Sequence, residues 1–202
     1  MKPVIFGLSG HALTPDETAF FKEADPAGYI LFRRNVETRE QVRALTDSLR
    51  SLSGRTDLPI LIDQEGGRVQ RMTAPEWPKF PAAGEPFGML YAKAPMSAIE
   101  AARVNAEALA LGLAEVGITV DCLPVLDVRQ PGANDIIGDR SFGSDPVMVA
   151  ALGRATLDGL RAGGVVGVMK HMPGHGRSMV DSHLDLPRVT ATAEELEADI
   201  LP

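Results

Sequence analysis

The chain of 202 residues is long enough to bury a sizeable core, and 45% hydrophobic against 23% charged residues is ordinary for a globular protein. Its formal net charge of −7 offers no basic stripe to displace counterions from phosphates, which argues against a nucleic-acid partner. A single cysteine excludes an internal disulfide framework, and no apolar run is long enough to span a bilayer. Residues 1–11 have too short an apolar run for a signal peptide, so we expect a soluble cytoplasmic protein.

The first part of the chain predicts three strands and two helices. A strand at residues 4–8 precedes Thr14-Pro15-Asp16-Glu17, which combines an N-cap, a proline at the first helical position and a capping-box glutamate. A second strand at 28–32 precedes the capping box Thr38-Arg-Glu-Gln41, which opens a helix to about residue 52. The apolar run at 59–63 is typical of a strand buried on both faces.

The rest of the chain continues the alternation. Residues 72–96, rich in Pro, Gly and Ala, predict a long irregular excursion, and Ser97 is expected to cap a helix to about residue 116. A fourth strand is expected at 118–125, a helix from Asp145-Pro146 to about 162, and a fifth strand at 165–169. A capping box at Thr192-Ala-Glu-Glu195 opens the last helix.

Five strand–helix units in series predict a parallel sheet, either doubly wound or part of a barrel. No Gly-x-Gly-x-x-Gly motif follows the first strand, where a dinucleotide-binding fold would carry it. We therefore expect an α/β fold of the (β/α)8 TIM-barrel type, of which this chain supplies about the first five units. Polar residues directly after several strands favour the barrel, whose sites lie at that face: Arg33, Arg34, Asp63 to Glu65, Asp127, Lys170 and His171.

The segment KHMPGHGRSMVDSH, residues 170–183, concentrates three histidines, a lysine and an aspartate. Imidazole and carboxylate groups suit zinc or iron, but Pro173 and the nearby glycines deny the helix that an HxxxH metal site uses. A phosphate cradle would lack the Walker pattern and a following helix, and a flexible polar loop is the plainest alternative. We favour an acid/base dyad, because residues two apart in an extended segment point to one side and Asp181 can bond a ring nitrogen of His183.

Two further motifs leave alternatives open. IDQEGGRVQR, residues 62–71, places Asp63 at the barrel mouth with a sharp turn behind it, or is only a polar strand-to-loop turn. In IGDRSFGSDP, residues 137–146, Arg140 is either an anchor for a polar substrate or a surface charge.

Four motifs in this order resemble those of the bacterial β-N-acetylglucosaminidases (β-N-acetylhexosaminidases) of glycoside hydrolase family 3, enzymes of peptidoglycan recycling: LIDQEGGRVQRM, PVLDV, IGDRSFGSDP and KHMPGHGRSMVDSHLDLP. The resemblance runs through essentially the whole chain. It implies that residues 1–202 form the N-terminal part of a single barrel that removes terminal β-linked N-acetylglucosamine with retention of configuration. The implied partner is a small carbohydrate, a GlcNAc-containing muropeptide. We expect no metal, organic cofactor, nucleic acid or membrane partner, and a monomer or weak oligomer.

The resemblance also implies roles for individual residues. His183 is expected to be the general acid/base and Asp181 its orienting partner, in agreement with the dyad read from the residues alone. A second set is expected to bind the sugar: Asp63, Arg71, Arg140, Lys170 and His171.

Retaining hydrolysis also needs a carboxylate nucleophile opposite the acid/base. In the family this is an Asp in a Ser-Asp-Asp-type motif after a late barrel strand, and that motif does not occur in these 202 residues. Asp63 and Asp127 are rejected as substitutes, because the motif of Asp63 matches a binding position and that of Asp127 has no catalytic role in the family. We expect the nucleophile beyond Pro202.

Two alternatives to the hydrolase remain at this point. If 202 residues is the natural length, the missing nucleophile makes a non-catalytic sugar-binding protein the alternative. A β-N-acetylglucosaminide phosphorylase could use the same dyad, since a histidine, unlike a carboxylate, does not repel an incoming phosphate.

Overall fold

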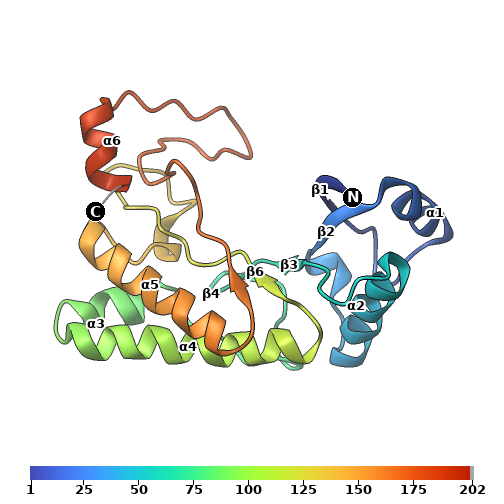
Figure 1. The fold of residues 1–202 in the computed structure, drawn as a ribbon. Coiled ribbons are helices and arrows are strands. Elements are labelled where there is room, and N and C mark those ends of the chain that lie inside the picture. Colours follow the sequence, from blue (N-terminus) through green and yellow to red (C-terminus); the bar gives the residue numbers. More distant parts are fainter. Residues whose placement is uncertain (201–202) are drawn as a thin grey trace.

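A computed structural model describes residues 1–200, so the last two residues of the expected 1–202 unit lie outside the described residues. Its main feature is one sheet of five parallel strands (Figure 1). The strands are β1 (Lys2–Gly7), β2 (Pro26–Leu31), β3 (Ile60–Ile62), β6 (Val120–Asp121) and β7 (Val166–Gly167). They are neighbours in the order in which they occur along the chain. This order confirms the predicted five-stranded parallel sheet and lacks the reversal that a doubly wound sheet shows, within residues 1–200.

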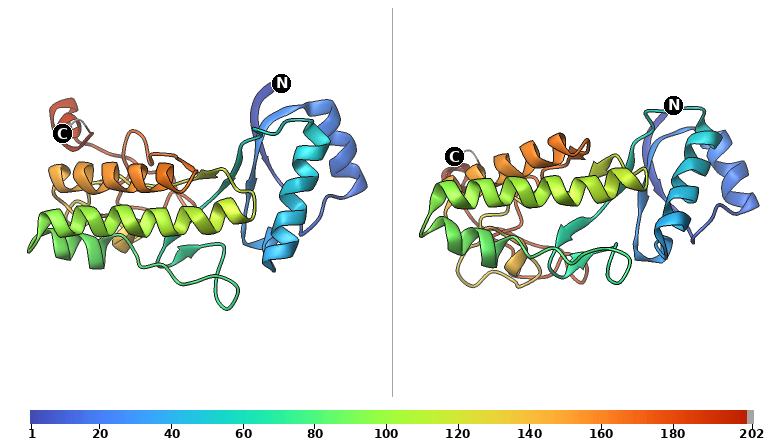
Figure 2. Two further views of the ribbon diagram at one scale, coloured as in Figure 1. Left: turned by 60° about the horizontal axis from the view of Figure 1, so that its bottom comes forward. Right: turned by 90° about the horizontal axis from the view of Figure 1, so that it is seen from below.

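A helix follows each strand of the sheet before the next strand begins. The main helices are α1 (Pro15–Ala24), α2 (Arg39–Ser53), α4 (Pro95–Glu115), α5 (Pro146–Ala162) and α6 (Ala193–Ile200). Short turns join them: η1 (Arg33–Asn35), the π-helical turn η2 (Gly84–Gly88), α3 (Met89–Tyr91) and η3 (Gly138–Arg140). Helices α4 and α5 lie side by side along one face, while α1 and α2 pack beside β1 and β2 at the other end (Figure 2).

Local capping signals place most helix starts. Thr14 and Glu17 form the predicted reciprocal capping box of α1, and Asp145 caps α5 through the N–H of Val147. At α2 the prediction is half right. Thr38 accepts the N–H of Gln41, but the Gln41 side chain accepts from the N–H of Glu37 instead of returning to Thr38.

Three predictions about the elements differ from the structure. Helix α4 begins at Pro95 rather than at a Ser97 cap, because a proline at the first helical position has no N–H that needs an acceptor. The excursion at 72–96 is not irregular throughout, since it contains η2 and α3. The fourth strand is also shorter than the predicted 118–125. Regular pairing ends at Asp121, and contact with the fifth strand resumes as a single bridge between Val125 and Lys170.

The core lies between the sheet and the helices. A large apolar cluster fills this space, with members from β2, β3, α2 and α4, such as Leu31, Ile60, Leu49 and Leu109. The two edge strands are less covered: Ile5 of β1 is 47% exposed and Val166 of β7 is 65% exposed. Among the described residues, no helix is both long and apolar enough to cross a membrane.

Candidate active site

The sequence-predicted sugar-binding residues gather at one end of the sheet. Asp63 directly follows β3, and Lys170 and His171 follow β7. Because β3, β6 and β7 pair in parallel, their carboxyl ends meet at the same edge, as at the mouth of a barrel. Arg140 ends η3, which packs over this edge from the connection between β6 and α5.

A small hairpin carries Arg71 back to Asp63. Strand β4 (Gln64–Gly66) pairs antiparallel with β5 (Val69–Gln70), and the chain enters the tight turn between them through Gly66 and Gly67, with φ +96° and +58°. A Cβ at Gly66 would lie 2.1 Å from the carbonyl oxygen of Pro81. The side-chain oxygen of Gln64 accepts the N–H of Arg71 at 2.9 Å. The sharp turn predicted behind Asp63 is therefore confirmed, and the sequence did not indicate the hairpin that returns Arg71.

These elements bring five charged side chains into one network, which we call the charged cluster. Its members are Asp63, Glu65, Arg71, Arg140 and Lys170. The Lys170 amino group lies 3.0 Å from Asp63 Oδ1 and 2.5 Å from Glu65 Oε1. Arg71 Nη2 donates to Asp63 Oδ2 at 3.0 Å. Arg140 donates two hydrogen bonds to Glu65, from Nε to Oε2 at 2.8 Å and from Nη2 to Oε1 at 2.9 Å.

The contacts within the cluster favour the charged forms of Asp63, Arg140 and Lys170. Burial by itself would raise the pKa of Asp63, but the charges of Lys170 and Arg71 outweigh it and lower that pKa. Burial likewise opposes the charge of Lys170, yet Glu65 and Asp63 raise the pKa of its amino group. Three cations face two carboxylates at this end of the sheet. An ammonium has three donors, and two of those of Lys170 meet carboxylates, which leaves one for a ligand hydroxyl or carbonyl.

His171 continues the network on one side. Its Nδ1 lies 2.6 Å from Asp127 Oδ2, and its Nε2 lies 3.5 Å from Arg140 Nη2. The other carboxylate oxygen of Asp127 accepts the N–H of His175 at 2.6 Å. All five predicted sugar-binding residues therefore belong to one continuous set of contacts.

The predicted dyad is formed, but away from the charged cluster. His183 Nδ1 lies 2.7 Å from Asp181 Oδ1, and the N–H of His183 donates to the same oxygen at 2.9 Å. These two hydrogen bonds lower the pKa of Asp181, the backbone bond most. The His183 side chain is 75% exposed on the long segment between β7 and α6. Among the described residues, no hydrogen bond or ion pair joins this dyad to the charged cluster.

Three buried carboxyl groups at this site were given no binding role from the sequence: Glu65 and Asp127 were noted only as strand-end residues, and Asp121 was not singled out. Glu65 joins Lys170 to Arg140, and Asp127 holds His171. Asp121, fully buried at the end of β6, accepts the N–H of Gln64 at 2.9 Å through one oxygen, and its other oxygen has no hydrogen-bond partner among the described residues. The available signal was their position, since each lies at or just after a strand end.

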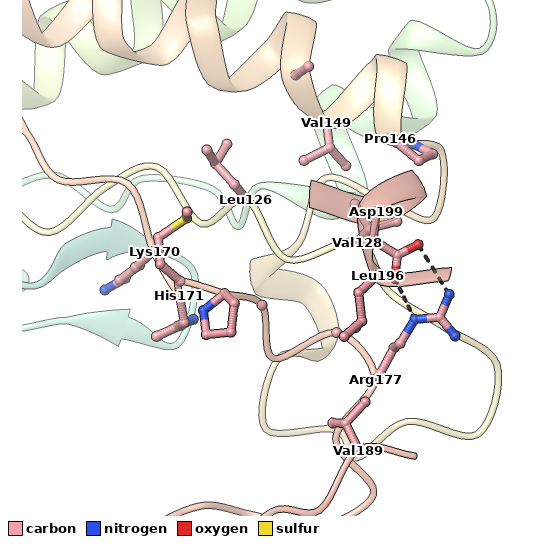
Figure 3. A pocket seen from close by; sticks show the side chains of 15 residues that line it. Leu126, Val128, Pro146, Val149, Lys170, His171, Arg177, Val189, Leu196 and Asp199 are labelled. Atoms are coloured by element: carbon pink, nitrogen blue, oxygen red, sulfur yellow. Dashed lines mark hydrogen bonds and ion pairs between the residues drawn. The ribbon is translucent and has the colours of Figure 1, made fainter. Parts of the chain in front are cut away.

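A separate, mostly apolar cavity of about 240 Å³ lies between α5, the segment after β7, and α6. Of the charged cluster, only Lys170 lines it, and Figure 3 shows the Lys170 amino group directed away from the other lining residues. At the opposite side of the cavity Arg177 pairs with Asp199 of α6, with Nε 2.5 Å from Oδ2. Among residues 1–200, no three His, Cys, Asp or Glu side chains are grouped as metal ligands.

The fold and the position of the charged cluster define the class as a β/α-barrel protein with its site at the carboxyl ends of the strands. The family model described as "Glycosyl hydrolase family 3 N terminal domain" matches residues 10–202, and the chain belongs to this family. The resemblance drawn from the four motifs is therefore confirmed.

Curated relatives and solved structures agree with this assignment. The chain is 39% identical over 201 residues to a protein named Beta-hexosaminidase from Alkalilimnicola ehrlichii, covering 99% of this chain and 57% of that protein. It is 36% identical to a Beta-hexosaminidase from Xanthomonas oryzae pv. oryzae, covering 98% and 58%. The native structure of NagZ from Neisseria gonorrhoeae superposes with a TM-score of 0.92 at 37% identity, covering 98% of this chain and 57% of that one. This match confirms the predicted barrel-type fold. The chain spans about 57–58% of the length of these proteins.

Proposed function

We propose that the protein carrying this chain is an exo-acting, retaining glycoside hydrolase that removes terminal β-linked N-acetylglucosamine. The observation that carries the proposal is the 39% identity to a Beta-hexosaminidase across 99% of the chain. A structure of NagZ from Neisseria gonorrhoeae in complex with N-trifluoroacetyl-D-glucosamine, at a TM-score of 0.92, supports a GlcNAc-type ligand. We further propose that the substrates are muropeptides, that the protein works in the cytoplasm, and that it is a monomer or weak oligomer.

In this proposal the charged cluster binds the sugar. Asp63 would accept hydrogen bonds from sugar hydroxyls, because a carboxylate with two oxygens can accept more bonds than Lys170 and Arg71 supply. Lys170 would donate its remaining N–H to a hydroxyl. His171 and Arg140 would contact the same ring from the other side of Glu65. Such charge-assisted bonds are the stronger class of hydrogen bond.

His183 would transfer the proton. Asp181 holds Nδ1, so Nε2 is the nitrogen left to protonate the leaving oxygen of the glycoside and later to take a proton from water. A separate carboxylate must attack the anomeric carbon to form the glycosyl-enzyme intermediate of a retaining enzyme. We place that nucleophile in the part of the relatives' length that this chain does not span.

The chain would then be the N-terminal part of one catalytic barrel. Strands β1 and β7 are the two edges of the sheet, and each carries an exposed apolar side chain, Ile5 in β1 and Val166 in β7. Further strands paired to these edges would cover them and close the barrel, which leaves no edge exposed.

The test compares wild type with His183→Ala in the intact protein on two substrates. A GlcNAc-containing disaccharide needs a proton on its leaving oxygen, whereas a 4-nitrophenyl glycoside has a good leaving group. We expect His183→Ala to lower kcat/KM for the disaccharide by about 10²- to 10⁴-fold and to affect the aryl glycoside much less. The matched control is His11→Ala, which removes an exposed histidine paired with Glu37 at 3.5 Å. Unchanged disaccharide turnover in His183→Ala would contradict the assignment of His183 as the proton donor. Product that forms only with added phosphate would indicate a phosphorylase, and binding without turnover would indicate a sugar-binding protein.

A further inference from the structure

Asp127 stands out as a buried carboxylate with two different donors. Its side chain is 0% exposed, and each of its oxygens accepts one short bond. Oδ2 lies 2.6 Å from His171 Nδ1, and Oδ1 accepts the backbone N–H of His175 at 2.6 Å. One carboxylate thus contacts two residues, His171 and His175, at the start of the segment that continues to the Asp181–His183 dyad.

The backbone fixes where this carboxylate lies. Val125 bridges to Lys170, and the N–H of Leu126 donates to the carbonyl oxygen of Lys170 at 2.7 Å. The Ser141 hydroxyl donates to the carbonyl oxygen of Asp127 at 2.6 Å. Farther along, the N–H of Gln130 donates to the carbonyl oxygen of Gly176 at 3.0 Å. The two segments are therefore held against each other on both sides of Asp127.

The donors and acceptors around His171 define its tautomer. A carboxylate only accepts hydrogen bonds, so the proton of a neutral His171 ring belongs on Nδ1 facing Asp127. The other nitrogen, Nε2, then has a free lone pair. It faces the guanidinium of Arg140, which can only donate, at 3.5 Å. Asp127 on one side and Arg140 on the other favour the same tautomer.

We propose that Asp127 is a positioning residue, which sets the Nδ1–H tautomer and orientation of His171 and anchors the base of the dyad segment through His175. The role of His171 in sugar binding rests on the proposed function, whereas its tautomer and the anchoring of His175 by Asp127 do not. Asp127 touches no substrate in this scheme and acts through His171 and the backbone of His175.

Asp127→Asn separates the two roles. The backbone N–H of His175 cannot lose its proton, so the Asn oxygen must accept it, and the Asn NH2 must then donate to His171 Nδ1. The ring is expected to switch to its Nε2–H tautomer, which turns a donor toward Arg140. Asp127→Ala removes both bonds and is expected to release the His175 N–H as well.

The first measurement needs no substrate. Long-range ¹H–¹⁵N spectra of the intact protein at pH 8 report which nitrogen of His171 carries the proton, and amide exchange reports the His175 N–H. We expect Nδ1–H in wild type and Nε2–H in Asp127→Asn. The His175 amide should stay protected in Asp127→Asn and exchange at least 10-fold faster in Asp127→Ala. Nε2–H in wild type overturns the proposal without any variant, as does an unchanged tautomer in Asp127→Asn.

The second measurement is a kinetic cycle with the aryl glycoside. Asp127→Asn should lower kcat/KM about 10- to 100-fold, the scale of a lost hydrogen bond to a charged group. On a His171→Ala background the same change should cost less than about 3-fold, because coupled residues are not additive. Thr156→Val, which removes a buried hydroxyl bonded to Leu152 within α5, is the control for a buried polar change. Additive losses overturn the proposal. A protein without any glycosidase activity refutes the proposed function, and the spectra still decide the role of Asp127.

Discussion

Glu65 is the member of the charged cluster whose loss should be most costly to folding. Its carboxylate receives three contacts from two cations, two from Arg140 at 2.8 and 2.9 Å and one from Lys170 at 2.5 Å. The side chains of Glu65 and Arg140 are only 4% and 11% exposed. Glu65→Gln keeps the shape and one accepting oxygen but removes the charge, and its NH2 would face one of the cationic donors.

The expected loss follows from which cation is left without a counter-charge. Lys170 keeps Asp63 at 3.0 Å, whereas among the described residues Arg140 keeps no carboxylate within hydrogen-bond distance, its remaining contacts being the carbonyl oxygen of Ile136 and Nε2 of His171. Removing one partner of a buried ion pair costs about 3–5 kcal/mol, because the other charge stays buried and unpaired. Since only one of the two cations loses its carboxylate, we expect the lower end, about 3 kcal/mol in the free energy of unfolding.

Equilibrium unfolding in urea, followed by circular dichroism at pH 7, measures this loss in the intact protein. The control is Glu107→Gln, which removes the same charge from a partly exposed pair with Arg103 on α4 and should change the free energy of unfolding by less than about 1 kcal/mol. A loss below about 1 kcal/mol for Glu65→Gln, or a loss no larger than that of the control, would refute the view that Arg140 depends on Glu65.

Two further predictions concern other carboxylates of the site. Burial raises the pKa of Asp121 well above 3.8. A carboxyl whose pKa is raised on folding contributes stability below its ordinary pKa and loses it as pH rises through the folded pKa. Asp121→Asn should therefore gain stability relative to wild type as pH rises from 4 to 8 in thermal melts, and a pH-independent difference contradicts this. Arg177→Met should loosen α6 by breaking the Asp199 pair, seen as faster amide exchange across 193–200, and unchanged exchange there contradicts it.

Much of the fold could be predicted because its signals are local. A capping box is read from four consecutive residues, and those at Thr14 and Thr192 both form. Polar residues after apolar runs indicated one end of a parallel sheet. Strand lengths and the start of α4 depend on which backbone groups find hydrogen-bond partners. The helix starts at Pro95, two residues before Ser97, so the capping propensity of Ser97 did not decide its start.

The charged cluster was predictable only in part. Asp63 and Lys170 are 107 residues apart, and Glu65 and Arg140 are 75 apart, so their pairing depends on the register of β3, β6 and β7 and on the path of η3. Strand-end position and motif resemblance nominate single residues. They do not say which carboxylate faces which cation, and for that reason Glu65, although noted at the strand end two residues from Asp63, was given no binding role.

The two histidine–carboxylate pairs differ in the same way, because one is formed between near neighbours in the sequence and the other between distant segments. In both, Nδ1 bonds a carboxylate oxygen, at 2.6 Å for His171 and 2.7 Å for His183. The Asp181–His183 pair spans two residues, so extended backbone alone brings it together, and it forms although His183 is largely exposed. The Asp127–His171 pair spans 44 residues and exists only because the segments after β6 and β7 run side by side. A pair made locally can move as a unit with its segment, whereas a buried pair made across strands holds its histidine fixed. That difference suits the roles proposed for them, His183 as a proton-transfer group that approaches the leaving oxygen and His171 as a binding group held in place.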